Sequence, residues 1–285
     1  IKMIKVFAPA KLNLTLKILN RYENGYHNIE SIIAFASIGD TILIKRNKKF
    51  KLRVIGPEYK MLLKEKNENL IRKTIFLLSQ KTGIDTNVKI TLIKRLPTAA
   101  GLGGGSADAA ATLRGMLMLN KNNIQRRLIE EVASDLGSDI LACLYSKTLF
   151  IKGKGNEIET IPNITRGLWA VIVNPRIATY TKDIFNAHNT SFSKSVRPVK
   201  DKSYLEFHLR KCGNDLTKTV NTMVPETNTI LNVLSLFPKA KYTRISGSGS
   251  SVFSLFKNSK DAYKVASFLK NRRKKWWISA VPLLG

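Results

Sequence analysis

The sequence predicts an α+β protein of two domains. Its 285 residues exceed one ordinary domain, since a domain usually takes roughly 100–200 residues. In the first half, segments with alternating apolar residues are interspersed with segments of helical spacing, as expected for strands and helices that share a core. Near residues 161–167 the sequence loosens into Pro162, Asn163 and Gly167. We therefore expect one domain over residues 1–162 and a second over residues 163–285.

The first half opens with a strand in which apolar and polar residues alternate. Its apolar face is formed by Leu12, Leu14, Leu16 and Ile18. Its polar face carries Lys11 and Asn13 side by side. A helix is expected over residues 69–82, because apolar residues recur there at helical spacing and Gly83 provides a C-terminal stop. The other elements expected in this half are strands at 41–45 and 88–92 and a helix at 124–136 that Gly137 ends.

The second half is expected to alternate strands and helices as well. Pro225 suits the first position of a helix, because the N–H that proline lacks would have no partner there. The strands are expected at 169–173, 242–245, 251–256 and 276–281, and the helices at 181–188, at 225–237 and from Asp261. A tight turn at Ser246–Gly249 separates two of these strands.

The glycine-rich stretch at residues 97–110 is the most informative feature of the chain. Four glycines lie within five residues, and they permit the positive φ values that turn successive N–H groups inward around an anion. A helix follows, with Ser106 as the expected N-cap. Its apolar face comprises Ala109, Leu113, Met116 and Leu117. Because unpaired N–H groups and roughly half a positive charge converge at a helix N-terminus, the pattern favours a phosphate site over a tightly packed turn.

Composition limits the possible classes of protein. The chain is 44% hydrophobic and 24% charged, which is typical of a soluble globular protein. No apolar run approaches the roughly 20 residues that cross a bilayer, and the apolar part of the first ten residues is too short for a signal peptide. Two cysteines without metal-ligand spacing predict neither a zinc site nor a disulfide framework. We therefore expect a cytoplasmic protein with no membrane partner.

The net charge of +28 suits either nucleic acid binding or the steering of anionic small molecules. The lysines are scattered, however, and the two basic runs at 45–51 and 270–275 lack the interleaved aromatic residues of an RNA-binding sheet. We interpret most of the charge as solvated surface and expect no nucleic acid partner. A basic nucleic-acid-binding protein remains the alternative of a different class; it would bind RNA with a steep salt dependence and would not turn over ATP.

Three familiar nucleotide-binding motifs do not fit the glycine loop. A P-loop requires a lysine after its last glycine, and none follows here. The catalytic motifs of protein kinases are absent from the sequence. A dinucleotide-binding fingerprint requires a third glycine where this chain has Ser106.

Five motifs, in this order and over essentially the whole chain, resemble the GHMP kinase superfamily. They are Ala8–Leu14 (APAKLNL), Gly25–His27 (GYH), the loop at 97–110, Gly137–Asp139 (GSD) and Ser246–Gly249 (SGSG). The resemblance implies a small-molecule kinase with a ribosomal-protein-like N-terminal domain, an α/β C-terminal domain and an active site in the cleft between them.

Within the superfamily, APAKLNL and GYH are most similar to one branch. That branch transfers the γ-phosphate of ATP to the 2-hydroxyl at the methylerythritol end of a cytidine diphosphate conjugate, in non-mevalonate isoprenoid precursor synthesis. Another kinase of the superfamily, acting on mevalonate or homoserine, is the alternative.

The resemblance implies Asp139 as the base that takes the hydroxyl proton and Lys11 as its cationic partner. A positioned carboxylate can contribute on the order of 10²–10⁴ to the rate of such a transfer. An ammonium beside it would keep the carboxylate ionised and stabilise the developing alkoxide. The alternatives are a structural aspartate in a turn and one more surface lysine.

The resemblance also assigns ligand contacts, motif by motif. The residues implied for ATP are Asn69 and Lys94 on the adenosine side and Pro97, Ala100, Gly101, Leu102, Gly103, Gly104, Gly105 and Ser106 around the phosphates. Mg²⁺ is expected to arrive with ATP, and no protein ligand is assigned to the metal. We interpret Asp108 as an acid that complements the helix dipole rather than a metal ligand.

For the second substrate, the resemblance implies Asn13, Tyr26, His27, Thr181, Phe185, Gly247, Ser248 and Gly249. Tyr26 would stack on the cytosine, His27 would bond its edge, and Phe185 would cover the other face of the ring. A helix core position is the alternative for Phe185. The expected partner is thus a small molecule with a cytidine diphosphate moiety, bound by a monomer or weak homodimer.

Overall fold

The computed structural model describes residues 2–63, 69–121, 123–161, 164–189, 191–196 and 201–284. These residues form two compact units that are interleaved along the chain. Unit 1 takes the described residues of 1–10, 38–98 and 103–146, and unit 2 takes those of 11–37, 99–102 and 147–285. The predicted division between residues 162 and 163 falls on residues outside the described ones and stays a prediction.

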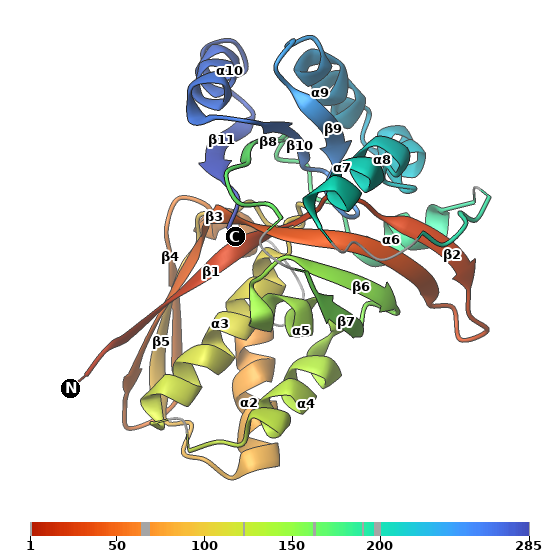
Figure 1. Cartoon of the computed structure of the whole chain (residues 1–285). Helices are drawn as coiled ribbons and strands as arrows, with labels where there is room; N and C mark the ends of the chain where they lie inside the picture. The colour runs from red at the N-terminus through yellow and green to blue at the C-terminus, as the bar shows by residue number, and fades with distance from the viewer. Residues whose placement is uncertain are drawn as a thin grey trace. The chain divides into compact units, whose positions relative to one another are not determined.

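Unit 1 combines strands with a group of helices (Figure 1). Its strands are the first part of β1 (Ile4–Asn13), the last part of β3 (His27–Arg46), β4 (Lys51–Ile55) and β5 (Val88–Ile93). β5 is antiparallel to β3, and β4 is parallel to β5. The parallel pair needs a long crossover, which here contains the first two helices. The mixture confirms the α+β class predicted from the sequence.

The helices of unit 1 are α1 (Tyr59–Leu63), α2 (Leu70–Thr82), α3 (Gly104–Leu119), α4 (Arg126–Leu136) and α5 (Ser138–Tyr145). α2 contacts α3 and α4, and α5 contacts the same two helices. α3 packs directly on the strands, because a Cβ added at Gly115 would lie 2.5 Å from the Ile44 side chain of β3.

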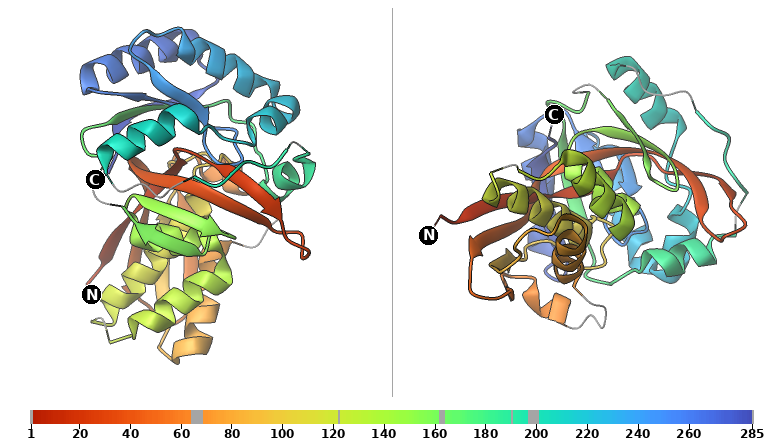
Figure 2. Two further views of the ribbon diagram at one scale, coloured as in Figure 1. Left: turned by 45° about the vertical axis from the view of Figure 1, so that its right-hand side comes forward. Right: turned by 90° about the horizontal axis from the view of Figure 1, so that it is seen from below.

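Unit 2 contains a four-stranded antiparallel sheet of order β11-β8-β10-β9. Its strands are β8 (Trp169–Asn174), β9 (Lys241–Ile245), β10 (Val252–Phe256) and β11 (Trp277–Pro282). α9 (Pro225–Ser235) and α10 (Ser259–Arg272) contact this sheet and lie on one side of it (Figure 2). Buried Val171, Ile230 and Leu269 are part of the apolar core between them.

The rest of unit 2 is built around the first part of β3. β2 (Lys17–Arg21) and β6 (Leu149–Gly153) both run antiparallel to it, and β7 (Glu157–Thr160) pairs with β6. The remaining helices are α6 (Thr181–Ala187), α7 (Lys202–Lys211) and α8 (Thr217–Met223). None of the helices in the described ranges is both long and apolar enough to span a membrane.

The structure corrects the expected strand at residues 11–18. β1 ends at Asn13 and β2 begins at Lys17, because the N–H groups of Leu14 and Leu16 bond to the carbonyls of Ile32 and Gly213. The predicted polar face is also buried: Lys11 is 5% exposed and Asn13 is 2% exposed.

The helix expected at 69–82 is confirmed as α2. Its N-cap is Asn69, whose side chain accepts from the N–H of Ile71, and Gly83 ends it with φ +66°. Sequence periodicity missed α5, α7, α8 and the short strands β6 and β7.

We predict that Gly39→Ala destabilises unit 1. A Cβ at Gly39 would lie 2.0 Å from the carbonyl oxygen of Ala8, so the backbone of β1 or β3 would have to shift. The free energy of unfolding should fall by about 3 kcal/mol, measured by urea denaturation. Gly213→Ala is the matched control, because a Cβ there has nothing within 4 Å. Equal losses in the two variants would contradict the steric explanation.

Candidate active site

The glycine loop enters α3 three residues earlier than the sequence indicated. Gly103 is the N-cap, with φ +61°, and α3 begins at Gly104, so the expectation of Ser106 as N-cap was wrong. Ser106 lies inside the first turn instead. Gly103 offers no side chain to cap the helix, the first turn has no acidic residue, and Gly105 is exposed. The first N–H groups of α3 therefore have the properties of an anion site.

Asp139 lies in the first turn of α5, two residues after Gly137, the N-cap of that helix. Its carboxylate is half-buried and complements the positive end of that short helix. The opposite end of α5 is held by Arg114 of α3, which donates 2.8 Å to the carbonyl oxygen of Cys143 and also to that of Leu144. Arg114 thus couples the position of the helix carrying Asp139 to that of the helix following the glycine loop.

A buried cluster of charges lies under the start of α3. The Lys94 ammonium is 2.6 Å from Asp40 and 3.0 Å from Asp108. Burial alone would lower the pKa of Lys94, but the two carboxylates outweigh it and raise that pKa. The interpretation of Asp108 as an acid that complements the helix dipole was therefore incomplete, since its carboxyl faces Lys94.

In unit 2, the other part of the glycine loop packs against the turn at residues 246–249. Gly101 has φ +70°, and a Cβ there would lie 2.2 Å from the carbonyl oxygen of Ser246. Ser246 Oγ donates to the carbonyl of Gly101 at 2.8 Å and accepts from the N–H of Asn13 at 3.2 Å. The end of β1, the loop and the turn are thereby joined at one point.

Lys11 and Asn13 form a hydrogen-bonded pair at the end of β1. Lys11 Nζ donates to Asn13 Oδ1 at 3.0 Å, and Asn13 Nδ2 donates to Ser31 Oγ at 2.9 Å. The backbone N–H of Lys11 bonds to the carbonyl of Leu102 in the glycine loop at 2.8 Å. The alternative of a surface lysine is thus excluded, because Lys11 is buried among polar partners.

The segment leading into α6 is bonded to the same region. Thr181 and Ser248 share a hydrogen bond of 3.0 Å between their hydroxyls. The N–H of Ser251 donates to the carbonyl of Ala100 at 3.0 Å. Asn174, at the end of β8, donates to the hydroxyls of Ser250 and Ser251. Three segments that are far apart in sequence are therefore fixed together within unit 2.

His27 and Phe185 lie in contact, with ring centroids 5.1 Å apart and an angle of 43° between planes. His188, which the sequence gave no reason to select, packs edge-on against His27 at 6.4 Å. Burial, followed by the positive charge of Arg21, lowers the pKa of His27 below 6.5. Burial likewise lowers the pKa of His188. At neutral pH His27 is uncharged, with one ring nitrogen able to donate and the other to accept.

Tyr26 is 63% exposed, and Lys154 Nζ lies 5.2 Å from the centroid of its ring. The ring is accessible to a ligand, and Lys154 places a cation over it. Tyr26 and His27 are adjacent in sequence, yet only His27 is buried, beside Phe185.

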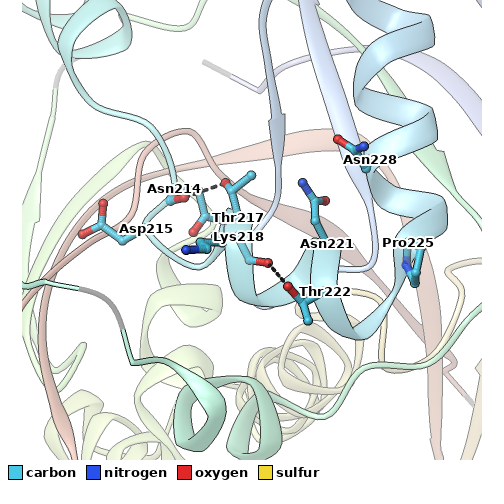
Figure 3. Close-up of a pocket in the computed structure, with 8 residues that line it drawn as sticks. All are labelled: Asn214, Asp215, Thr217, Lys218, Asn221, Thr222, Pro225 and Asn228. Carbon is cyan, nitrogen blue, oxygen red and sulfur yellow. Dashed lines mark hydrogen bonds between the residues drawn. The ribbon is translucent and has the colours of Figure 1, made fainter.

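Unit 2 also has an open, polar pocket of about 650 Å³ around α8 and the start of α9 (Figure 3). Its lining comprises Asn214, Asp215, Thr217, Lys218, Asn221, Thr222, Pro225 and Asn228. Asn214 connects this pocket to the turn at residues 246–249, donating to the carbonyl of Gly247 at 2.7 Å. The sequence gave no reason to predict any of these residues as part of a binding site.

Metal ligands are few. The described parts of the chain contain no group of three or more His, Cys, Asp or Glu side chains arranged to hold a metal ion.

Sequence reasoning missed several residues that organise the site, chiefly Asp40, Asn174, Ser246 and Ser250. Each is a buried polar side chain whose partner lies far away in the sequence. Periodicity and spacing carry no signal for such pairs, although Ser246 is the first residue of the recognised motif at 246–249.

Comparison with known proteins gives a consistent result. The family model "GHMP kinases N terminal domain" matches residues 69–147, and "GHMP kinases C terminal" matches residues 203–275. A curated relative from Paramagnetospirillum magneticum, 4-diphosphocytidyl-2-C-methyl-D-erythritol kinase, is 34% identical over 281 residues, which cover 98% of both chains.

Solved structures agree. A crystal structure of 4-(cytidine 5'-diphospho)-2C-methyl-D-erythritol kinase matches with a TM-score of 0.80 and 27% identity, covering 99% of this chain and 100% of the other. A homoserine kinase from Cytophaga hutchinsonii matches with a TM-score of 0.72 and 19% identity over 99% of this chain and 95% of the other, a likeness of fold alone.

The neutral histidines predict a pH dependence of stability. Because the pKa of His27 is below its ordinary value of 6.5 in the folded chain, the unfolded chain binds more protons as the pH falls below about 6.5. The free energy of unfolding should therefore decline from pH 7 to pH 5. His27→Asn should show a shallower decline than the wild type, measured by urea denaturation at each pH. Tyr26→Phe is the control, and identical slopes for all three proteins would contradict the assignment.

Proposed function

The chain belongs to the GHMP kinase family, among its 4-diphosphocytidyl-2-C-methyl-D-erythritol kinases, and we propose that it transfers the γ-phosphate of ATP to the 2-hydroxyl of 4-diphosphocytidyl-2-C-methyl-D-erythritol. The products are ADP and the 2-phosphate, a step of non-mevalonate isoprenoid precursor synthesis. As a member of this family the chain is a small-molecule kinase. The curated relative and the 27% identical structure carry the name of that activity over nearly their full lengths.

The observation that carries the proposal is the uncapped start of α3 behind a glycine loop. The N–H groups of Gly104, Gly105 and Ser106 lie in the first turn, and Gly103 reaches that turn through a left-handed φ. Anionic phosphate oxygens are the ligands that such a turn stabilises. ATP fits there, with Pro97, Ala100, Gly101 and Leu102 completing the loop. Mg²⁺ would reach the site with ATP and neutralise phosphate charge.

Asp139 and Lys11 are proposed to act on the acceptor hydroxyl. The hydroxyl oxygen attacks the γ-phosphorus, the bond to the ADP oxygen breaks, and the Asp139 carboxylate takes the hydroxyl proton. Lys11 provides a buried ammonium whose orientation Asn13 fixes at 3.0 Å, so it is prepared to stabilise negative charge on the attacking oxygen.

The cytidine moiety is proposed to bind at Tyr26, His27 and Phe185. A neutral His27 can donate to and accept from a base edge, as pyrimidine recognition requires. The exposed Tyr26 ring is available to stack on a base, an interaction worth roughly 1–3 kcal/mol. Phe185 contacts His27, and we propose that this contact holds the His27 ring in the orientation that binds the base.

Thr181 and the turn of Gly247, Ser248 and Gly249 are proposed to position the rest of the substrate. The hydrogen bond between Thr181 and Ser248 supports a shared role. On the adenosine side, Asn69 caps α2 through its side-chain oxygen, which leaves its amide nitrogen for a nucleotide. The state of a monomer or weak homodimer, the cytoplasmic location and the absence of a nucleic acid partner stay predictions.

We predict that the purified chain releases ADP from ATP with the cytidine diphosphate conjugate and not with mevalonate or homoserine. A coupled assay of ADP release should therefore show turnover with the conjugate alone. Turnover with mevalonate or homoserine alone would assign the chain to another activity of the superfamily. RNA binding without any ATP turnover would favour the nucleic-acid-binding alternative.

We predict that Asp139→Asn lowers kcat by about 10²–10⁴, because the amide cannot take the hydroxyl proton. Binding of ATP should be unchanged, as measured by equilibrium dialysis. Asp135→Asn is the matched control and should retain full kcat. It makes the same change at an aspartate of α4 that forms an exposed ion pair with Lys81 of α2. Near-normal turnover of the Asp139 variant would refute its role as the base.

A further inference from the structure

The cluster of Asp40, Lys94 and Asp108 is a buried group of three charges. Lys94 is 1% exposed, Asp40 is 0% exposed and Asp108 is 3% exposed. The ion pairs of Lys81 with Asp135 and of Arg46 with Asp85, by contrast, lie at the surface. Burying three ionisable groups is costly, and well-packed apolar residues are often equally stable in such places. The cluster therefore calls for a role beyond the stability of unit 1.

The cluster joins the two ends of the glycine loop. At the entrance, Asp40 Oδ1 accepts from the backbone N–H groups of Arg95 and Leu96 at 2.5 and 2.9 Å. At the exit, Lys94 reaches Asp108 of α3 at 3.0 Å. Lys94 itself directly follows β5, so one side chain connects the strand before the loop with the helix after it.

The first residue of α3 rests on the ammonium of this cluster. A Cβ added at Gly104 would lie 3.0 Å from Lys94 Nζ and 3.7 Å from Asp40 Oδ2. Any side chain there would press on the buried charges. The absence of a side chain at Gly104 therefore lets the backbone at the start of α3 lie directly over Lys94.

The protonation of the cluster also suits an anion site. Three ionised groups would leave a net negative charge beneath the helix start. Burial raises the pKa of Asp108 well above its ordinary value, against the pull of Lys94, and the negative charge of Asp40 raises it further. Asp108 Oδ1 has no hydrogen-bond partner among the described residues. Both effects on the pKa favour the neutral form of Asp108, which would lessen the negative charge beneath the helix start.

We propose that Asp40, Lys94 and Asp108 are positioning residues for the nucleotide, which hold the N–H groups of Gly103–Ser106 in the arrangement that binds phosphate. Lys94 then acts from beneath the loop and does not itself contact ATP. This proposal rests on the ATP-dependent function proposed above. It also replaces the expectation that Lys94 lies on the adenosine side, because its ammonium is fully engaged inside unit 1.

Asp40→Asn tests the proposal most directly. The variant keeps an oxygen for the N–H groups of Arg95 and Leu96 but turns an amide NH₂ toward the Lys94 ammonium. KM for ATP should rise about tenfold or more, with KM for the cytidine conjugate unchanged. Asp108→Asn keeps an oxygen that can accept from Lys94 and leaves the Asp40 bonds to Arg95 and Leu96 intact, so its rise in KM for ATP should be several times smaller. Asp85→Asn, which removes an exposed pair with Arg46, is the control and should match the wild type.

Asp40→Asn, measured beside Lys94→Met, separates positioning from direct contact. If Lys94 touched ATP, Asp40→Asn would free the ammonium and leave KM for ATP unchanged or lower, while Lys94→Met would raise it. That pattern would overturn the proposal. So would a lower melting temperature of Asp40→Asn without any change in KM for ATP, since it would show a purely structural role. If Lys94→Met fails to fold, the two aspartate variants still decide.

ATP affinity measured by equilibrium dialysis separates this proposal from the proposed function. A wild type that binds ATP but does not phosphorylate the conjugate would contradict the reaction alone. Asp40→Asn should then still weaken ATP binding about tenfold. Equal ATP affinity in Asp40→Asn and the wild type would refute the positioning role, whatever the reaction.

Discussion

The close approach of two backbone segments at Gly101 is the constraint on which unit 2 depends. No side chain fits between Gly101 and the turn that begins at Ser246, because a Cβ would lie 2.2 Å from a carbonyl oxygen. The contact brings Ser246 into reach of Asn13, and Asn13 in turn orients Lys11. The position of the ammonium proposed to stabilise the alkoxide therefore follows from a glycine far from it in sequence.

Two different kinds of contact hold the glycine loop, one for residues 99–102 and another for residues 103–106. Residues 99–102 pack in unit 2 through backbone contact and neutral hydrogen bonds. Residues 103–106 belong to unit 1, where the buried cluster of Lys94 lies under the helix start. Both devices fix backbone rather than side chains, which suits a loop whose ligands are its own N–H groups. Arg114 likewise fixes backbone in α5, because it donates to carbonyl groups at the end of the helix that carries Asp139.

The strongly periodic parts of the fold could be predicted from the sequence. α2 is confirmed with its C-terminal stop at Gly83, because such a stop is a local signal that acts within one turn of the chain. The expected strand at 11–18 failed for a tertiary reason: the N–H groups of Leu14 and Leu16 find partners in Ile32 and Gly213, which no alternation reveals. The order of the motifs was likewise sufficient to recognise the family, and its membership is confirmed.

The sequence by itself determined which residues are chemically suited to the site: a glycine loop before a helix, an aspartate after Gly137, and a lysine and an asparagine two residues apart. Only the tertiary structure decided their environments. From the sequence, Asp108 was interpreted as an acid that complements the helix dipole and Lys94 as a ligand contact. The structure instead buries the two side chains against each other and against Asp40. Folding likewise brings the His188 ring beside the His27 ring. The physical reason is that local signals act over one turn or one strand, whereas burial and charge pairing depend on residues that only folding brings together.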